Sequence, residues 1–174
     1  TVRTLPQILD HAIAETQDNL DKVERFRYLR ECVVLGRAFN MSIAYELALK
    51  LRETSYLRAQ PFASPDFLHG PIAIVREGYP VIAIANRGAA LPSVLAVVQN
   101  VRSRGAEAVI IGNSSEALKL ADVAFPVNQN EDIPEILSPF PSIVAGQLFA
   151  QRLAVTKGFD PDKPEGLKKV TVTV

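Results

Sequence analysis

Residues 80–127 read PVIAIANRGAALPSVLAVVQNVRSRGAEAVIIGNSSEALKLADVAFPV, and this stretch carries the strongest fold signal of the chain. Short apolar runs rich in Val, Ile and Ala alternate in it with helical patterns. The runs lie at 80–85, 108–112 and 123–127, and the helical patterns lie at 90–104 and 115–121. Near-continuous apolar strands that alternate with helices are typical of a parallel sheet covered on both faces. The stretch therefore predicts an α/β fold with right-handed connections between its strands.

The same pattern extends toward the N-terminus. Residues 31–36 (ECVVLG) form a short apolar run ended by glycine and predict another buried strand. A stripe of Ile and Leu side chains at helical spacing predicts a helix over 43–57, with Asn40 or Ser42 as its N-cap. Residues 5–29 are polar but carry a loose apolar stripe. We expect them to form a helix that packs on the sheet or on another chain.

The rest of the chain is less regular. Residues 61–71 should form a loop with a short helical turn that Ser64 could cap. A long helix is expected within 133–158, beginning near its start or only after Pro141, and residues 160–174 should form an extended arm. The pattern thus gives four clear strands and a possible fifth in one domain without internal repeats.

Composition excludes several classes of function. The 174 residues include 19 Lys and Arg and 19 Asp and Glu, so the formal net charge is zero. This balance argues against a broad positively charged surface that binds nucleic acid or an anionic membrane. The only cysteine, Cys32, excludes an internal disulfide and a cysteine-cluster metal site, and we expect neither metal nor cofactor.

No apolar run approaches the roughly 20 residues needed to span a bilayer, and the first residues lack a signal-peptide pattern. We therefore expect a cytoplasmic protein that handles a small molecule. The sequence begins with Thr1 rather than Met, which would suit a piece of a longer protein.

Ligands of open α/β sheets sit beyond the carboxyl ends of the strands. Three predicted loops lie at such ends, at 36–39, 86–88 and 112–114. None is a dinucleotide fingerprint or a phosphate-binding P-loop. Simple strand-to-helix turns explain each of them equally well from the pattern alone.

Glu46, Lys50 and Glu53 stand at helical spacing and share one face of a predicted helix. A solvated Glu–Lys pair is one interpretation. The other is a carboxylate beside an ammonium that faces a cleft and transfers protons.

For the remaining candidate residues the sequence also allows both a structural and a functional interpretation. His69 is either a structural loop residue or a group that titrates near neutral pH at a site. Lys168 and Lys169 are either solvated charges on the arm or amines that fold back to hold an anion or form a Schiff base. His11 is expected at the surface, and Cys32 is expected to be buried and unreactive.

Taken together, three segments resemble the sugar isomerase (SIS) family. They are ELALKLRETSY at 46–56, HGPIA at 69–73 and the tail at 157–173, whose last residues read LKKVTVT. The resemblance is greatest to the C-terminal SIS domain of the isomerising glucosamine-6-phosphate synthases and to glucosamine-6-phosphate deaminases. Each segment alone is a weak signal, but their order and spacing hold over nearly the whole chain.

The resemblance implies a flavodoxin-like, three-layer αβα sandwich around a mostly parallel sheet of about five strands. Residues 1–174 would be a single SIS domain with an N-terminal helical segment at 1–30 and a C-terminal arm at 159–174. It would be the C-terminal half of a tandem-SIS enzyme that acts as a homodimer. The ligand would be a hexose 6-phosphate or an amino-sugar phosphate, interconverted between ketose and aldose with amination or deamination.

The resemblance also implies roles for single residues. Glu53 would be the base that moves the proton between C1 and C2, and His69 would open the sugar ring in the neighbouring subunit. Lys169 would contact the open-chain sugar. Glu46, Lys50 and Lys168 would help to bind the substrate.

The chain departs from the family at the phosphate cradle. The Ser-x-Ser-Gly-x-Thr loop of the family is replaced by Asn-Arg-Gly-Ala at 86–89. In the synthases that loop belongs to the first SIS domain, which is missing here together with the glutaminase domain. We therefore expect the isolated chain to be nearly inactive. The alternative function is a non-catalytic SIS module that senses sugar phosphates in a regulator, which would not need Glu53, His69 and Lys169 together.

Overall fold

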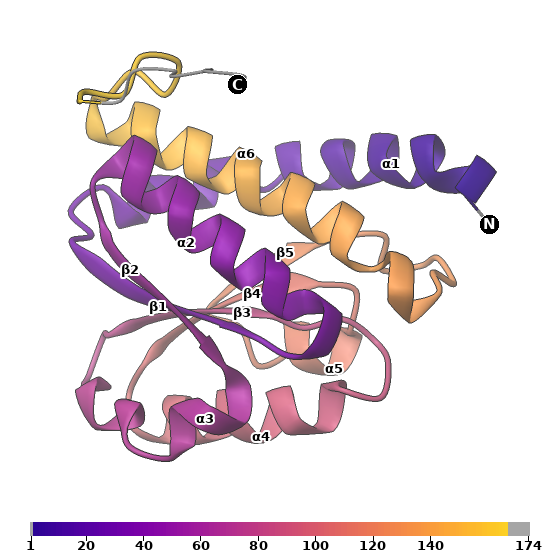
Figure 1. The fold of residues 1–174 in the computed structure, drawn as a ribbon, viewed down its shortest axis with the longest axis horizontal. Helices are drawn as coiled ribbons and strands as arrows, with labels where there is room; N and C mark the ends of the chain where they lie inside the picture. The colour runs from indigo at the N-terminus through magenta and orange to yellow at the C-terminus, as the bar shows by residue number, and fades with distance from the viewer. Residues whose placement is uncertain (1, 167–174) are drawn as a thin grey trace, which may run out of the picture.

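The computed structural model describes residues 2–166, and within them five parallel strands form one sheet (Figure 1). The strand order is β2-β1-β3-β4-β5, and every neighbouring pair is parallel. The strands are β1 (Glu31–Gly36), β2 (Arg58–Ala63), β3 (Pro80–Ile84), β4 (Glu107–Gly112) and β5 (Val123–Pro126). Three of them match the apolar runs in residues 80–127.

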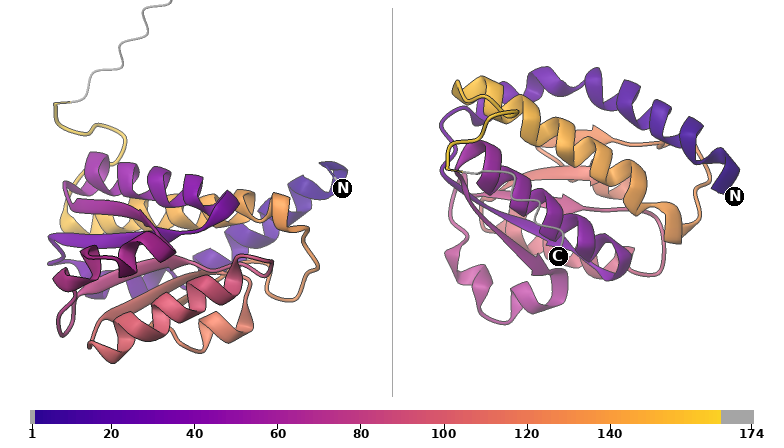
Figure 2. Two further views of the ribbon diagram at one scale, coloured as in Figure 1. Left: turned by 60° about the horizontal axis from the view of Figure 1, so that its bottom comes forward. Right: turned by 45° about the horizontal axis from the view of Figure 1, so that its top comes forward.

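Helices cover both faces of this sheet (Figures 1 and 2). One face carries α1 (Leu5–Gln17), α2 (Met41–Ser55) and α6 (Pro139–Lys157). The other carries α3 (Ser64–Leu68), α4 (Leu91–Ser103) and α5 (Ser115–Leu118). Short 3-10 helices lie at Val2–Thr4, Leu20–Phe26, Ala38–Asn40, Pro71–Ile74 and Glu135–Leu137. The three-layer αβα sandwich is confirmed.

Alternate residues of the strands enter two separate hydrophobic cores. Val34 and Ile82 pack with the α2–α6 layer, whereas Val33 and Ala83 pack with the α3–α4 layer. Each large side chain buried in this way stabilises the fold by roughly 1.5–3 kcal/mol. Helices bury both faces of the sheet. For this reason the strand sequences are continuous apolar runs rather than alternating apolar and polar residues.

The N-terminal segment differs from the expected helix over 5–29. The α-helix ends at Gln17, and a 3-10 helix follows from Leu20. Asn19 turns its side chain back to the Glu15 carbonyl (2.7 Å), a local bond of the kind that competes with helix continuation. Ile8 and Ala12 are buried within the chain, and α1 packs on α6 and β5. The apolar stripe of α1 therefore has an intrachain partner and gives no argument for a dimer.

The sequence pattern did not predict the edge strand β2. It occupies Arg58–Ala63, where the pattern indicated a loop from Pro61 onward. Pro61 lies opposite Val34 of β1, and a proline in a strand suggests a break because it cannot donate a ladder hydrogen bond. Among the described residues β2 pairs only with β1, so this edge position tolerates the proline.

One capping prediction is confirmed and two were wrong. Asn40 occupies the N-cap position of α2, although its side chain makes no capping hydrogen bond, whereas Ser42 lies inside the helix and its hydroxyl donates to the Phe39 carbonyl. The Ser64 hydroxyl donates to the Gly36 carbonyl (3.2 Å) and so ties the start of α3 to the end of β1. The long helix α6 begins at Pro139, just after the 3-10 helix Glu135–Leu137, between the two starts that the sequence suggested.

Candidate functional site

Glu46, Lys50 and Glu53 share one side of α2, as their spacing predicted. The Lys50 Nζ atom lies 2.7 Å from Glu53 Oε2 and 3.9 Å from Glu46 Oε1. The hydrogen bond to Glu53 raises the pKa of Lys50, although partial burial works against it. Lys50 is therefore a fixed cation whose nearest anion is Glu53, and all three side chains are half-buried rather than freely solvated.

A pocket of about 230 Å³ opens beside Lys50 between α2 and α6. It is lined by Lys50, Thr54, Gln147, Ala150, Gln151, Pro161 and Asp162, and more of its exposed surface is apolar than polar. The ammonium, hydroxyl, two amides and carboxylate among these residues can form hydrogen bonds with a polyhydroxylated ligand. The two helices lie side by side and end close to the C-terminal segment (Figure 1).

A larger cavity of about 480 Å³ lies elsewhere, at the amino ends of the strands. Arg25, Tyr28, Arg76 and Tyr79 are among its lining residues, and none of the predicted site residues lines it. We therefore assign the candidate site to the smaller pocket, which contains Lys50.

The C-terminal segment closes one side of this pocket. Phe159 packs edge-on against the ring of Tyr56, with centroids 4.8 Å apart. The backbone N–H of Glu165 donates to the Tyr56 hydroxyl oxygen at 2.7 Å. Lys168 and Lys169 lie outside the described residues, so their predicted roles stay predictions.

His69 lies apart from Glu53 within this chain. It is exposed and follows α3, in the layer that covers the opposite face of the sheet from α2. One chain therefore does not bring the predicted base and the predicted ring-opening histidine together. Sequence spacing alone could not show this separation, because it depends on which face of the sheet each helix covers.

The carboxyl edge of the sheet holds a buried network that sequence reasoning missed. The Asn86 amide donates to Asn40 Oδ1 (3.0 Å) and to the Ser142 hydroxyl (2.8 Å), and its oxygen accepts the Asn113 N–H (3.1 Å). Asn113 Oδ1 in turn accepts the Arg87 N–H (2.7 Å). The signal was an asparagine shortly after each of β1, β3 and β4. These residues bond one another at the strand end where resemblance to the SIS family implied a phosphate-binding loop.

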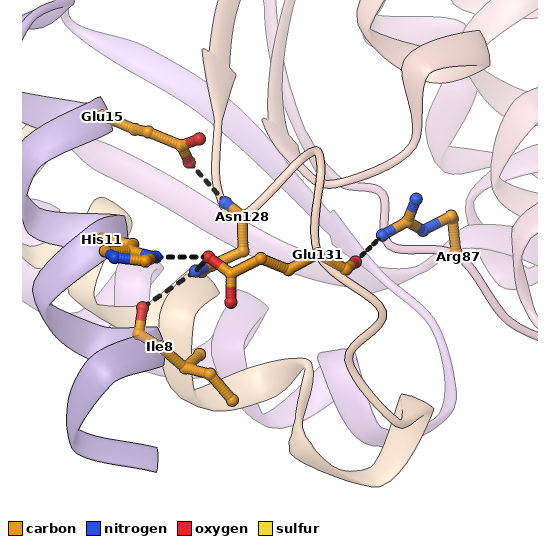
Figure 3. Close-up of polar contacts among 6 residues, drawn as sticks. All are labelled: Ile8, His11, Glu15, Arg87, Asn128 and Glu131. Atoms are coloured by element: carbon orange, nitrogen blue, oxygen red, sulfur yellow. Dashed lines mark hydrogen bonds and ion pairs between the residues drawn. The ribbon is translucent and has the colours of Figure 1, made fainter. Parts of the chain in front are cut away.

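A second polar cluster ties α1 to the loop after β5 (Figure 3). His11 Nδ1 lies 2.6 Å from Glu131 Oε1, and the Asn128 amide donates to the same carboxylate and to the Ile8 carbonyl. The guanidinium of Arg87 donates to the Glu131 carbonyl, which joins the loop after β3 to the cluster. His11 is at the surface as predicted, but it is paired.

These contacts shift two pKa values in opposite directions. The hydrogen bond to Glu131 raises the pKa of His11 above 6.5. Burial works to raise the pKa of Glu131, but hydrogen bonds from Asn128 and His11 outweigh it and lower this pKa. Cys32 is fully buried as predicted, and the loss of solvation raises the pKa of its thiol to about 12, which disfavours the reactive thiolate at neutral pH.

Residues 2–166 contain no cluster of three His, Cys, Asp or Glu side chains suited to a metal ion. No helix in that same range is long and apolar enough to cross a membrane.

Known proteins resemble this chain along nearly its whole length. The chain is 36% identical to a glutamine–fructose-6-phosphate aminotransferase (isomerizing) of Methanosarcina acetivorans and 32% identical to one of Thermococcus kodakarensis. These alignments cover 99% and 98% of the chain but only 28% of each relative. The chain thus spans little more than a quarter of the length of these relatives.

Solved structures show the same architecture. The C-terminal domain of a glucosamine-fructose-6-phosphate aminotransferase from Francisella tularensis superposes with a TM-score of 0.80 at 26% identity, over 92% of this chain and 45% of that one. A glucosamine-6-phosphate deaminase from Thermotoga maritima shares the fold, with a TM-score of 0.67 at 22% identity over 99% and 48% of the two chains. The family model for the SIS domain matches residues 29–157. The chain therefore belongs to the SIS domain family.

Proposed function

We propose that this SIS domain supplies the proton-transfer half of an active site that interconverts ketose and aldose forms of hexose 6-phosphates, with amination or deamination at C2. The observation that carries the proposal is the Glu53–Lys50–Glu46 cluster, whose Lys50 lines a pocket that the C-terminal segment closes on one side. Relatives named as isomerising aminotransferases align along nearly the whole chain.

The ketose–aldose interconversion needs one group that removes a proton from one carbon and returns it to the next. Glu53 is a carboxylate that can do this, and its bond to Lys50 holds it in place. Lys50 adds a fixed positive charge that stabilises the enediolate or enolamine formed between the two transfers. In this proposal Glu46 and Lys168 assist substrate binding, and Lys169 contacts the open-chain sugar.

The residues that bind the phosphate group of the sugar would come from outside this chain. The loop after β3 is Asn-Arg-Gly-Ala, in which the Asn86 side chain and the Arg87 N–H join the buried network and the Ala89 N–H donates to Glu135. A preceding SIS domain would fit the share of the relatives that the chain leaves uncovered. His69 would serve the neighbouring subunit of a homodimer, since it lies on the other face from Glu53. The single buried thiol suits work in the cytoplasm.

A regulatory, non-catalytic SIS module is not favoured. A sensor needs to bind a sugar phosphate but has no use for a paired carboxylate and ammonium beside the ligand. The curated relatives described above carry the names of enzymes.

The test is turnover by the full-length gene product. It would be incubated with glucosamine 6-phosphate, and separately with fructose 6-phosphate plus ammonia or glutamine, while amino-sugar formation and loss are followed. We expect turnover of the phosphorylated sugars and none of fructose or glucosamine. Binding of the phosphorylated sugars without turnover in either direction would refute the enzymatic function and support the regulator.

A further inference from the structure

Gln147 and Gln151 stand one turn apart on α6, and both line the pocket that contains Lys50. Both side chains are exposed. Neither carboxamide forms a hydrogen bond with any other group in residues 2–166. Each therefore keeps its two N–H donors and its carbonyl oxygen available to a ligand.

The facing wall of the pocket, on α2, offers a different set of groups (Figure 1). Lys50 and Thr54 also stand one turn apart. The Lys50 ammonium donates to Glu53 and can only donate further, while the Thr54 hydroxyl already donates to the Lys50 carbonyl (2.9 Å). The α2 wall thus presents donors on one residue and an acceptor on another, whereas each glutamine of α6 presents both side by side.

Sugar hydroxyls match the groups of the α6 wall. Every hydroxyl can donate and accept hydrogen bonds, so two neighbouring hydroxyls can pair with the N–H and the carbonyl oxygen of one carboxamide. Ala150 and Pro161 also line the pocket and can contact the C–H groups that a sugar carries beside its hydroxyls. The volume of about 230 Å³ is below the roughly 300–1,000 Å³ of complete small-molecule sites. The pocket is therefore a subsite that takes one part of a ligand.

We propose that Gln147 and Gln151 are specificity-determining residues whose carboxamides bind hydroxyl groups of the sugar phosphate. The inference rests on the proposed function, in which Glu53 transfers the proton between C1 and C2. Lys50 both holds Glu53 and lines the pocket, so a sugar whose reacting carbons lie against Glu53 extends past Lys50 toward α6. The hydroxyls bound by the two amides are those at C3 and C4.

Gln147→Met and Gln151→Met test this role in the full-length gene product. Methionine keeps the length and the helix propensity of glutamine but removes its N–H donors and its carbonyl acceptor. Each variant should raise KM for glucosamine 6-phosphate roughly 3–10-fold, the effect of losing a neutral hydrogen bond, with kcat little changed. The Tm should stay that of the natural protein, because neither amide has a partner to lose within residues 2–166. Gln99→Met, on the exposed side of α4 across the sheet, is the matched control and should leave KM unchanged.

Substrate selectivity gives a readout that a merely structural role would not move. The C3 and C4 epimers of glucosamine 6-phosphate each turn one hydroxyl away from the amides, and a site built to hydrogen-bond a hydroxyl discriminates against such analogues. The ratio of kcat/KM for glucosamine 6-phosphate to that for at least one epimer should fall roughly 3–10-fold in Gln147→Met and Gln151→Met and stay constant in Gln99→Met. Unchanged KM, or ratios unchanged against both epimers, would overturn the inference and leave the proposed function standing.

Binding measured without turnover separates this inference from the proposed function. Titration calorimetry of the full-length gene product with glucosamine 6-phosphate gives Kd directly, and both glutamine variants should weaken it roughly 3–10-fold. Weaker binding by the variants of a protein that turns over no sugar phosphate would support contact by the two amides, while the proposed function would fall. Kd values equal to that of the natural protein would overturn the contact whether or not the protein is an enzyme.

Discussion

Asn86 shows how one residue at the end of a strand organises an edge of this fold. Its amide contacts Asn40, Asn113 and Ser142, which come from three separate parts of the chain. All four side chains are buried. The sequence pointed to this edge but indicated only turns there, because turn-forming asparagines and network-forming asparagines look alike until the strands are placed side by side.

Asn86→Ala should lower the free energy of unfolding by about 2–4 kcal/mol, because it leaves several buried polar groups without partners. For a domain of this size that corresponds to a fall in Tm of roughly 4–16 °C. Thermal and urea unfolding measure both quantities. Asn100→Ala, at an exposed position on α4, is the matched control and should stay within about 0.5 kcal/mol of the natural protein. A loss at Asn86 no larger than the control's would show that the network is not structural.

The His11–Glu131 pair should respond to pH in two directions. Folding raises the pKa of His11 above 6.5, so its contribution is full below that pH and is lost as the pH rises through the raised pKa. Folding lowers the pKa of Glu131 below 4.5, so its contribution is full above that pH and is lost as the pH falls through the lowered pKa. The pair is therefore strongest between about pH 4.5 and 6.5.

An NMR titration of the His11 imidazole tests this pair. Glu131→Gln should move the pKa of His11 downward, because it removes the carboxylate that favours the imidazolium. Glu116→Gln, on the exposed side of α5, should leave the titration unchanged. An identical His11 titration in the natural protein and in Glu131→Gln would show that the contact does not persist in solution.

At the scale of elements, the hydrophobic pattern predicted the regular strands and helices. The elements that were predicted wrongly share one cause. The buried strands at 80–85 and 108–112 were predicted because both faces of the sheet are covered. The edge strand β2 was not predicted because Pro61 suggests a loop. The N-terminal helix was predicted to extend to residue 29 because Asn19 is compatible with a helix. In both places the outcome depends on contacts with neighbours that local pattern does not contain.

Two glycines of α6 should respond oppositely to substitution by alanine. Gly158 ends the helix at φ 86°, with no heavy atom within 4 Å of an added Cβ, so Gly158→Ala should cost about 1–2 kcal/mol from backbone strain alone. Gly146 lies inside the helix, where a Cβ would meet Leu47 at an ordinary 3.5 Å. Gly146→Ala should therefore stabilise by about 0.5–1 kcal/mol. Urea unfolding of both variants checks the signs, and a stabilising Gly158→Ala would contradict the helix end described here.

For the whole molecule, the topology separates the predicted site residues. The α2 layer holds Glu46, Lys50 and Glu53, while His69 lies in the layer beyond the sheet. Resemblance to the SIS family anticipated the fold and the cluster on α2. It could not show how the C-terminal segment closes on Tyr56, since that contact joins residues more than a hundred positions apart. In our proposal a complete site needs a second SIS domain and a second subunit.

The proposal depends most on Glu53 as the group that moves the proton between C1 and C2. The direct measurement is exchange of the sugar's C1 or C2 proton with solvent deuterium, followed by NMR in the full-length gene product and in Glu53→Gln. Glutamine keeps the shape and the reach of the side chain but cannot accept the proton. We expect exchange and turnover to fall together by roughly 10²–10⁴-fold, with KM little changed. Glu24→Gln, which removes only a surface ion pair with Arg152, should exchange at the natural rate. Exchange in Glu53→Gln at the natural rate would contradict the assignment and leave Glu53 as a structural partner of Lys50.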